Sequence, residues 1–153
     1  MESVRIITKN SKETQKVARV LAEEITTIHS DTAIVVALKG DLGAGKTTFA
    51  QGFARAFGVK ENVLSPTFVL MKIYDISRAG NLLHKHFIHI DCYRLTSPDD
   101  LLHLGFHDLL SDNDAVIIIE WADRVKNILP KNAIWISFEE GKKKNERVIV
   151  IKK

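Results

Sequence analysis

Eight consecutive residues in the first third of the chain carry its clearest chemistry. The segment Gly40-Asp41-Leu42-Gly43-Ala44-Gly45-Lys46-Thr47 matches the G-x-x-x-x-G-K-[ST] pattern at every fixed position. A loop of this composition wraps backbone N–H groups around a phosphate chain at the positive end of the following helix. The lysine reaches the β- and γ-phosphates, and the threonine hydroxyl binds Mg²⁺. We therefore expect residues 40–48, Thr48 included, to bind a nucleoside triphosphate, with Mg²⁺ as cofactor.

The residues on either side of this loop have the pattern that a phosphate loop requires. Thr32–Leu38, with the sequence TAIVVAL, predicts a buried strand that enters the loop, and Thr47–Phe57 predicts a helix that leaves it. An apolar run with so few polar residues is typical of a central strand that is covered on both faces. This context favours a true phosphate loop over a chance match.

Two carboxylates follow hydrophobic strands and are candidates for the acidic partner of the loop. Glu120 ends the run AVIIIE, and Asp91 ends HFIHID. In proteins with such a loop, the second magnesium ligand commonly ends a neighbouring strand, and one or two carboxylates suffice because Mg²⁺ keeps much of its water. We predict Thr47 and Glu120 as metal ligands, and Lys46, Asp91 and Glu120 as catalytic residues. Asp91 either holds a magnesium-bound water or orients the attacking water.

A segment after the loop helix, Ser65-Pro66-Thr67, has two interpretations. Its hydroxyls suit a switch that contacts the γ-phosphate or the metal, and its proline equally suits an ordinary strand entry. Three histidines nearby do not predict a zinc site. Strand alternation places His84 and His86 on one face and His89 on the other.

Three further side chains are left open between a structural and a functional role. Trp121, which follows Glu120, either belongs to the core or lies near the nucleotide. Arg94 and Arg124 either stabilise phosphate charge or are solvated and salt-bridged, as most arginines near strand ends are.

The elements that must position these residues alternate along the chain. Asn10 followed by Glu13 predicts a capping box, and Val17, Val20, Leu21, Ile25 and Ile28 form one apolar stripe of the helix that follows. The remaining segments are predicted as strands at 4–8, 62–75, 82–93, 115–120, 133–138 and 147–151 and as short helices at 99–110 and 123–129. The expected fold is α/β, a single P-loop NTPase domain over 1–153 with a mixed central sheet, an antiparallel hairpin and helices on both faces.

The composition says more about the cellular compartment of the protein than about its function. The 153 residues are 45% hydrophobic and 27% charged, with a net charge of +3, which is ordinary for a globular protein. The sequence has no apolar run of membrane-spanning length, and the single cysteine excludes an intrachain disulfide. We expect a cytoplasmic protein without a membrane association. The late cluster Lys142–Lys144 is interpreted either as a solvated turn or as a phosphate or RNA contact.

Four segments together resemble a known family. GDLGAGKTT at 40–48, SPTF at 65–68, HIDCYRL at 89–95 and IEWADR at 119–124 are similar to the TsaE family, also called YjeE. These are small bacterial ATPases needed for the threonylcarbamoyladenosine modification of tRNA at adenosine 37. The resemblance implies that Thr47 and Glu120 bind magnesium, that Asp91 is needed for activity and that Ser65–Phe68 acts as a switch. It also points to Ser11, Thr14 and Arg147 as residues that close over the nucleoside.

The resemblance further implies partners and a cycle. The partners are TsaB and TsaD, the tRNA is reached only through their complex, and the Mg-ATP cycle resets that complex between turnovers. Two alternatives stay open. One is a small-molecule P-loop kinase, which usually carries an arginine-rich lid and an acceptor-binding insertion, and no segment of this sequence is long enough to supply both. The other is a nucleotide-gated binding module with negligible hydrolysis. Because no arginine finger in cis is obvious, we expect weak hydrolysis that the partners stimulate.

Overall fold

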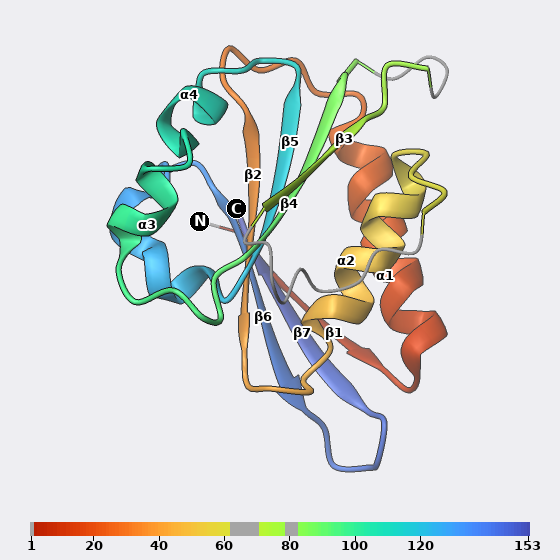
Figure 1. Cartoon of the computed structure of the whole chain (residues 1–153). Coiled ribbons are helices and arrows are strands. Elements are labelled where there is room, and N and C mark those ends of the chain that lie inside the picture. Colours follow the sequence, from red (N-terminus) through yellow and green to blue (C-terminus); the bar gives the residue numbers. More distant parts are fainter. Residues whose placement is uncertain (1, 62–70, 79–82) are drawn as a thin grey trace.

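One mixed sheet organises the part of the chain that the structure describes, residues 2–61, 71–78 and 83–153 (Figure 1). The structure is a computed structural model. Seven strands in these ranges lie in the order β1-β7-β6-β2-β5-β4-β3. Their bounds are β1 Ser3–Thr8, β2 Ile34–Gly40, β3 Met71–Asp75, β4 His86–Asp91, β5 Ala115–Glu120, β6 Ile134–Glu140 and β7 Arg147–Lys152.

The centre of the sheet is parallel and its margins are antiparallel. Strand β2 pairs in parallel with both β5 and β6, and β4 pairs in parallel with β5. At one margin β3 runs antiparallel to β4, which confirms the predicted hairpin, although residues 62–70 of its first segment lie outside the described residues. At the other margin β7 runs antiparallel to both β6 and β1. The carboxyl ends of β2, β4 and β5 therefore meet at one edge of the sheet.

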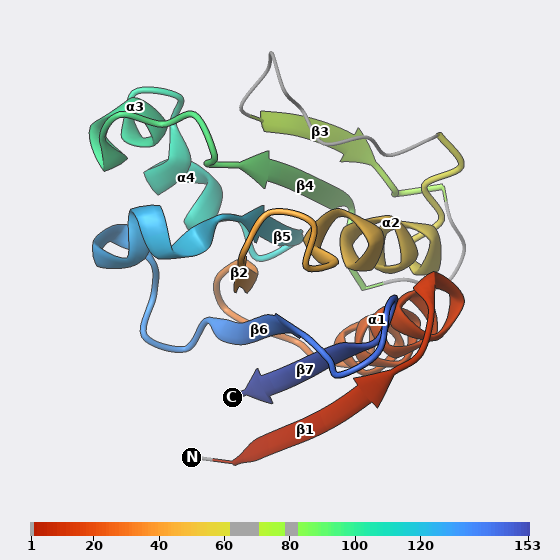
Figure 2. The ribbon, with the colours of Figure 1, turned by 90° about the horizontal axis from the view of Figure 1, so that it is seen from below.

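Helices cover both faces of this sheet, as predicted. Figure 2 shows α1 (Ser11–Ile25) and α2 (Lys46–Ala56) on one face, and α3 (Pro98–Leu102), α4 (Phe106–Leu110) and the 3₁₀ helix η1 (Ala122–Ile128) on the other. Ser97 caps α3 through its side-chain oxygen, with Pro98 at the first helical position. Among the described helices, none has the length and apolar character needed to cross a membrane.

Helix α1 differs from the prediction at its end and on its buried face. Asn10 accepts a hydrogen bond from the Glu13 backbone N at 2.9 Å, as the capping box predicts, but the helix ends at Ile25. Of the predicted stripe, Leu21 and Ile25 are buried, whereas Val20 and Ile28 are exposed, at 50% and 45%. The rest of the buried face consists of the smaller residues Thr14, Ala18 and Ala22.

Small residues on α1 and α2 allow the two helices to pack closely. A Cβ atom added to Gly52 of α2 would lie 2.7 Å from the Gln15 Cα of α1, so only glycine fits at this crossing. The predicted apolar stripe overlooked this because large hydrophobic residues are not needed where two backbones approach each other.

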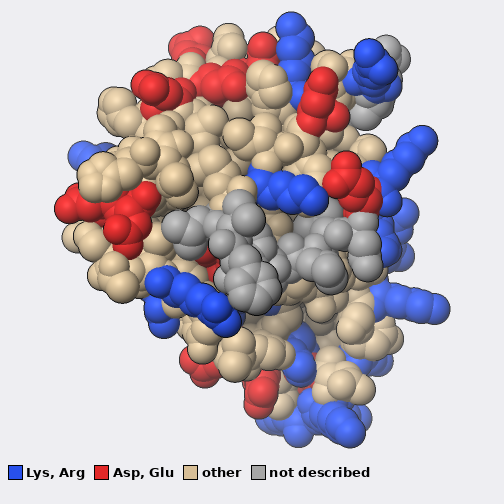
Figure 3. All heavy atoms as spheres, in the orientation of Figure 1, with Lys and Arg blue, Asp and Glu red and all other residues tan. Residues whose placement is uncertain are grey.

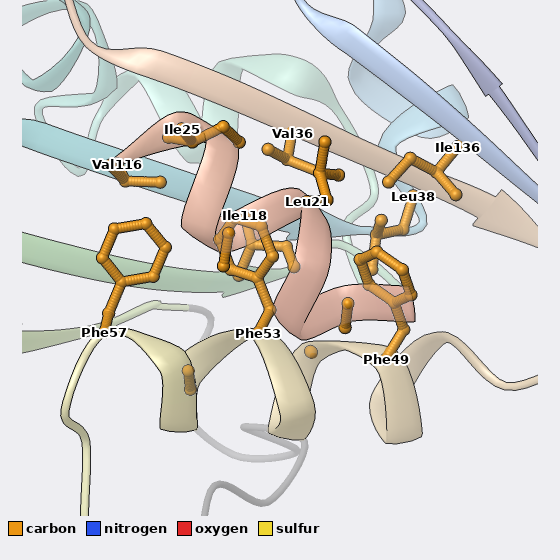
Figure 4. Packing of buried hydrophobic residues seen from close by; sticks show 14 of the residues in the cluster. Leu21, Ile25, Val36, Leu38, Phe49, Phe53, Phe57, Val116, Ile118 and Ile136 are labelled. Atoms are coloured by element: carbon orange, nitrogen blue, oxygen red, sulfur yellow. The ribbon is translucent and has the colours of Figure 1, made fainter. Parts of the chain in front are cut away.

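Three phenylalanines spaced four residues apart, two on α2 and the third at its C-cap, pack that helix onto the sheet. Figure 4 shows Phe49, Phe53 and Phe57 pointing toward side chains of β2 and β5, with Leu21 and Ile25 of α1 beside them. All three rings are fully buried, and truncating such a ring to alanine typically costs about 3–5 kcal/mol. This packing fixes the start of α2, and with it Lys46 and Thr47, at the carboxyl edge of the sheet.

Surface charge is unevenly distributed. Figure 3 shows acidic side chains gathered on the side of α3 and α4, and basic ones along the opposite side and at the tip of the β6–β7 hairpin. Lys142–Lys144 are exposed in the turn of that hairpin. This placement agrees with a solvated turn and leaves a phosphate or RNA contact unassigned.

Candidate functional site

A cavity of about 400 Å³ opens at the carboxyl edge of the parallel strands. It is bounded by the β2–α2 loop, the ends of β4 and β5, the start of α1 and the start of β7. The lining residues are Asn10, Ser11, Thr14, Leu42, Gly43, Gly45, Lys46, Thr47, Thr48, Asp91, Tyr93, Arg94, Glu120, Trp121, Asn145 and Arg147. The topology thus gathers most of the predicted site residues around one space.

The glycine-rich loop turns sharply between β2 and α2. Gly43 and Gly45 have φ values of 79° and 112°, which residues with a Cβ rarely adopt. Gly45 is the N-cap of α2 and provides no side-chain hydrogen bond to it, so the positive end of the helix faces the cavity without a competing side chain. Of the predicted loop residues, only Gly40, Asp41 and Ala44 do not line the described cavity wall.

Lys46 is a buried cation at the base of this loop. Its side chain is 4% exposed, and Nζ donates hydrogen bonds to the backbone oxygens of Gly40 at 2.5 Å and Asp41 at 2.8 Å. Burial lowers the pKa of this ammonium below its usual value, while Glu120 and other nearby carboxylates raise it. A positive charge that has lost water and faces a cavity is well placed to attract a phosphate.

Glu120 and Thr47 meet as the predicted metal ligands must. The Thr47 hydroxyl donates to Glu120 Oε1 at 2.7 Å, and Glu120 is only 1% exposed. Both groups offer hard oxygen atoms beside the space where a phosphate chain would lie. Two protein oxygens are enough for Mg²⁺, which completes its shell with water and phosphate oxygens, so the residues present fit this ion.

Asp91 lies directly beside Glu120. The two residues are register partners at the ends of β4 and β5. Asp91 is 7% exposed, and its Oδ1 accepts a hydrogen bond from the backbone N of Tyr93 at 2.9 Å. The carboxylate therefore stands at the cavity wall with a fixed orientation, next to the candidate metal ligand.

The residue that sequence reasoning missed is His89. Its Nε2 lies 2.5 Å from Glu120 Oε2, and its exposed fraction is 0%. Alternation on β4 places His89 on the same face as Asp91, so the spacing H-x-D held a usable signal. What the sequence did not provide was the parallel pairing of β4 with β5, which brings Glu120 to that face.

The other two histidines have separate surroundings. His86 lies 2.8 Å from Asp112 Oδ2. His84 was predicted to share a face with His86, but β4 begins only at His86, so alternation does not extend to it. Instead, the buried His84 ring packs edge-on against Phe57 of α2, with centroids 6.2 Å apart.

The three residues assigned to nucleoside contacts also line the cavity. Ser11 and Thr14 lie at the start of α1, and the Thr14 hydroxyl is hydrogen-bonded to that of Thr8 at 2.8 Å. Arg147, at the start of β7, donates to the Gly43 carbonyl oxygen at 3.2 Å. The first helix and the last hairpin are thus brought to the loop, although they are far from it in the sequence.

Trp121 packs against the core and also lines the cavity. The core that it packs against lies on the α3 and α4 side, and Lys46 Nζ lies 4.0 Å from the ring centroid. Its backbone has φ 57° and ψ 39°, which is unusual for a bulky residue and costs on the order of 1–3 kcal/mol. This conformation turns the ring beneath the lysine immediately after Glu120.

The two arginines left open differ in their positions. Arg124 stacks over Tyr93 and Trp121, with its guanidinium carbon 5.2 Å and 5.3 Å from the ring centroids, and donates a hydrogen bond to the Tyr93 carbonyl oxygen. Arg94 lines the cavity. The predicted switch residues Ser65, Pro66 and Thr67 lie outside the described residues.

A strand, a glycine-rich loop and a helix whose lysine and threonine face strand-end carboxylates define a phosphate-loop class of α/β protein. The family model described as threonylcarbamoyl adenosine biosynthesis protein TsaE matches residues 8–149. The chain belongs to the TsaE family.

Individual relatives agree with this assignment. The Haemophilus influenzae protein named tRNA threonylcarbamoyladenosine biosynthesis protein TsaE is 38% identical over 118 residues, 77% of this chain and 70% of that protein. The Bacillus subtilis protein of the same name is 33% identical over 138 residues, 89% of this chain and 77% of its own length. The crystal structure of Bacillus subtilis YdiB superposes with a TM-score of 0.74 at 28% identity, covering 98% of this chain and 84% of that one. The predicted fold class and family are thereby confirmed.

Proposed function

We propose that the protein is a Mg²⁺-dependent ATPase that acts in the threonylcarbamoyladenosine modification of tRNA. One observation carries the proposal: in a chain of the TsaE family, Lys46, Thr47 and Glu120 converge on one cavity, with the Thr47 hydroxyl 2.7 Å from the Glu120 carboxylate. In this proposal ATP is the substrate and TsaB and TsaD homologues are the partners. The cytoplasm is the compartment, and tRNA is reached through the complex.

The residues divide the work of phosphate transfer to water. Lys46 and the amides at the start of α2 bind the phosphate oxygens, since they form the positive end of the cavity. Thr47 and Glu120 hold Mg²⁺, which when bound neutralises charge on the phosphates. Asp91, fixed by its bond to Tyr93, orients the attacking water.

The mouth of the cavity supports the expectation that hydrolysis is weak without a partner. Leu42 is 72% exposed and Tyr93 is 41% exposed, so solvent reaches the space beside the loop. A partner that covers this mouth would exclude water and strengthen the electrostatic contacts inside. Arg94 and Arg147 both line the cavity, so the expected stimulation depends on closure of this open mouth and not on the lack of an arginine in cis.

The test is phosphate release by the protein alone and with the TsaB–TsaD pair, at saturating ATP with and without Mg²⁺. We expect slow Mg²⁺-dependent release alone and faster release with the pair, because a partner that covers the mouth excludes water. Turnover that stays flat with the pair present would favour a nucleotide-gated binding module. Phosphate release that is indifferent to Mg²⁺ would contradict the assignment of Thr47 and Glu120.

A further inference from the structure

One buried contact next to the proposed metal ligands is not used by the mechanism above. His89 Nε2 and Glu120 Oε2 lie 2.5 Å apart, and the two side chains are 1% and 2% exposed. Such a contact between titratable groups in a core is costly unless it is well hydrogen-bonded. We therefore expect the contact to affect how the Glu120 carboxylate is oriented.

The direction of this hydrogen bond follows from the chemistry of the pair. A glutamate that binds a cation is ionised and can only accept hydrogen bonds, so the proton lies on His89 Nε2. His89 Nδ1 is buried and has no hydrogen-bond partner within the described residues. The contact with Glu120 is thus the one side-chain hydrogen bond of this imidazole among the described residues.

Glu120 is consequently held at both oxygen atoms. Thr47 donates to Oε1 from α2, and His89 donates to Oε2 from β4. The register explains the second contact: His89 pairs with Ile118, two residues before Glu120 on β5, and both histidine and glutamate project toward α2. The imidazole is fully buried, on the sheet face that also carries Phe87 and Ile118.

We infer that His89 is a positioning residue that orients the carboxylate of Glu120 for Mg²⁺, an inference that rests on the proposed function. Hydrogen-bonded partners of metal ligands fix ligand orientation, and their loss typically weakens metal binding about 10–100-fold. Because His89 is buried beneath Glu120 and does not line the cavity, it acts on the metal only through that glutamate.

A matched pair on the same strand provides the control. His86 of β4 lies 2.8 Å from Asp112 Oδ2, but these side chains are 43% and 29% exposed and neither lines the cavity. A purely structural contact at His89 would resemble this one, so that its loss changes stability and leaves metal binding unaltered. Comparing variants of the two histidine–carboxylate pairs therefore distinguishes a role in orienting a metal ligand from a role in stability alone.

The experiment compares His89→Gln, His89→Asn and His89→Leu with His86→Leu. Glutamine can place an N–H near the position of Nε2, whereas asparagine offers its N–H near Nδ1 and leucine offers none. Binding of a non-hydrolysable ATP analogue is measured in EDTA and across a Mg²⁺ titration, and melting temperatures are recorded. We expect the Mg²⁺ concentration that gives half of the maximal increase in analogue affinity to rise about tenfold or more in His89→Asn and His89→Leu. It should stay near the wild-type value in His89→Gln and His86→Leu.

Affinity in EDTA should be unchanged in all variants, because the phosphate loop is intact. An unshifted Mg²⁺ titration in His89→Asn, or a shift in His89→Gln as large as in His89→Asn, would overturn the inference. The glutamine–asparagine pair decides the matter even if the leucine variant does not fold. Wild-type protein that binds the analogue equally with and without Mg²⁺ would overturn the proposed function, and the inference with it.

Discussion

Strands β4 and β5 present two different surfaces to the layers that cover them. Toward α1 and α2, the apolar Phe87 and Ile118 are followed at the carboxyl end by His89, Asp91 and Glu120. Toward α3, α4 and η1, the carboxyl-terminal halves of the same two strands are apolar, with Ile88, Ile90, Ile117 and Ile119 in the buried core.

Because side chains alternate along a strand, a residue that lines the cavity is followed directly by one that packs in the opposite core. Asp91 lines the cavity, whereas its neighbour Cys92 is fully buried in the opposite core, where burial raises the pKa of its thiol to about 12. The polar face tolerates burial because its members bind one another, as Glu120 binds Thr47 and His89. The apolar face needs only shape and volume.

The largest expected effect comes from removing the cation of the polar face. Lys46→Ala should lower ATP hydrolysis on the order of 10²-fold or more, since a preorganised donor to a charged transition state is lost. The fold should persist, because a charge that burial penalises is removed together with its two hydrogen bonds. Phosphate release and thermal melting measure the two effects.

Lys39→Ala is the matched control for this substitution. Lys39 is an exposed lysine of β2 that lies over the Trp135 ring at 5.8 Å, away from the described cavity lining. It should hydrolyse ATP at the wild-type rate. Retained activity in Lys46→Ala would show that the loop lysine is not needed for hydrolysis, and the proposed difference between the two faces would then be wrong.

A second, smaller effect should distinguish the two acids of the polar face. Glu120→Ala should raise the Mg²⁺ concentration needed for half-maximal activity by at least about tenfold, because a metal ligand is lost. Asp91→Ala should lower the maximal rate with a lesser change in that concentration, because it orients water. Mg²⁺ titrations of both variants at saturating ATP provide the measurement, and the reverse order would show that the two roles are exchanged.

Much of this fold follows from local pattern. The apolar runs before Gly40 and Glu120 became β2 and β5 at the predicted positions, and Ser97-Pro98 opened α3. The predictions succeeded where one signal dominates a short segment, as a continuous apolar run or a cap does. On α1 the predicted stripe was right for Leu21 and Ile25 and wrong for Val20 and Ile28. Ala18 and Ala22 share the buried face, because helix packing there depends on a partner that the sequence of α1 does not reveal.

The individual residues of the site could be predicted from the sequence, but the contacts between them were harder to predict. Lys46, Thr47, Asp91 and Glu120 each follow from a motif or a strand end, and all four line one cavity. The bond from His89 to Glu120 depends on the parallel register of β4 and β5, which joins residues 31 positions apart. The left-handed backbone of Trp121 likewise has no local signal, because tertiary contacts impose it.

The smallest effect tests whether the two faces are independent. Ile117→Val and Ile118→Val remove the same methylene from adjacent, fully buried positions of β5, so each should lower the free energy of unfolding by about 0.5–1.5 kcal/mol in urea titrations. Ile118 faces α2 and pairs with His89, whereas Ile117 faces the opposite core. Only Ile118→Val should therefore raise the Mg²⁺ requirement, by less than the roughly tenfold effect of losing a hydrogen-bonded partner. If Ile117→Val raised the Mg²⁺ requirement equally, that requirement would reflect the stability of the whole sheet. The two faces would then not have separate functional and structural roles.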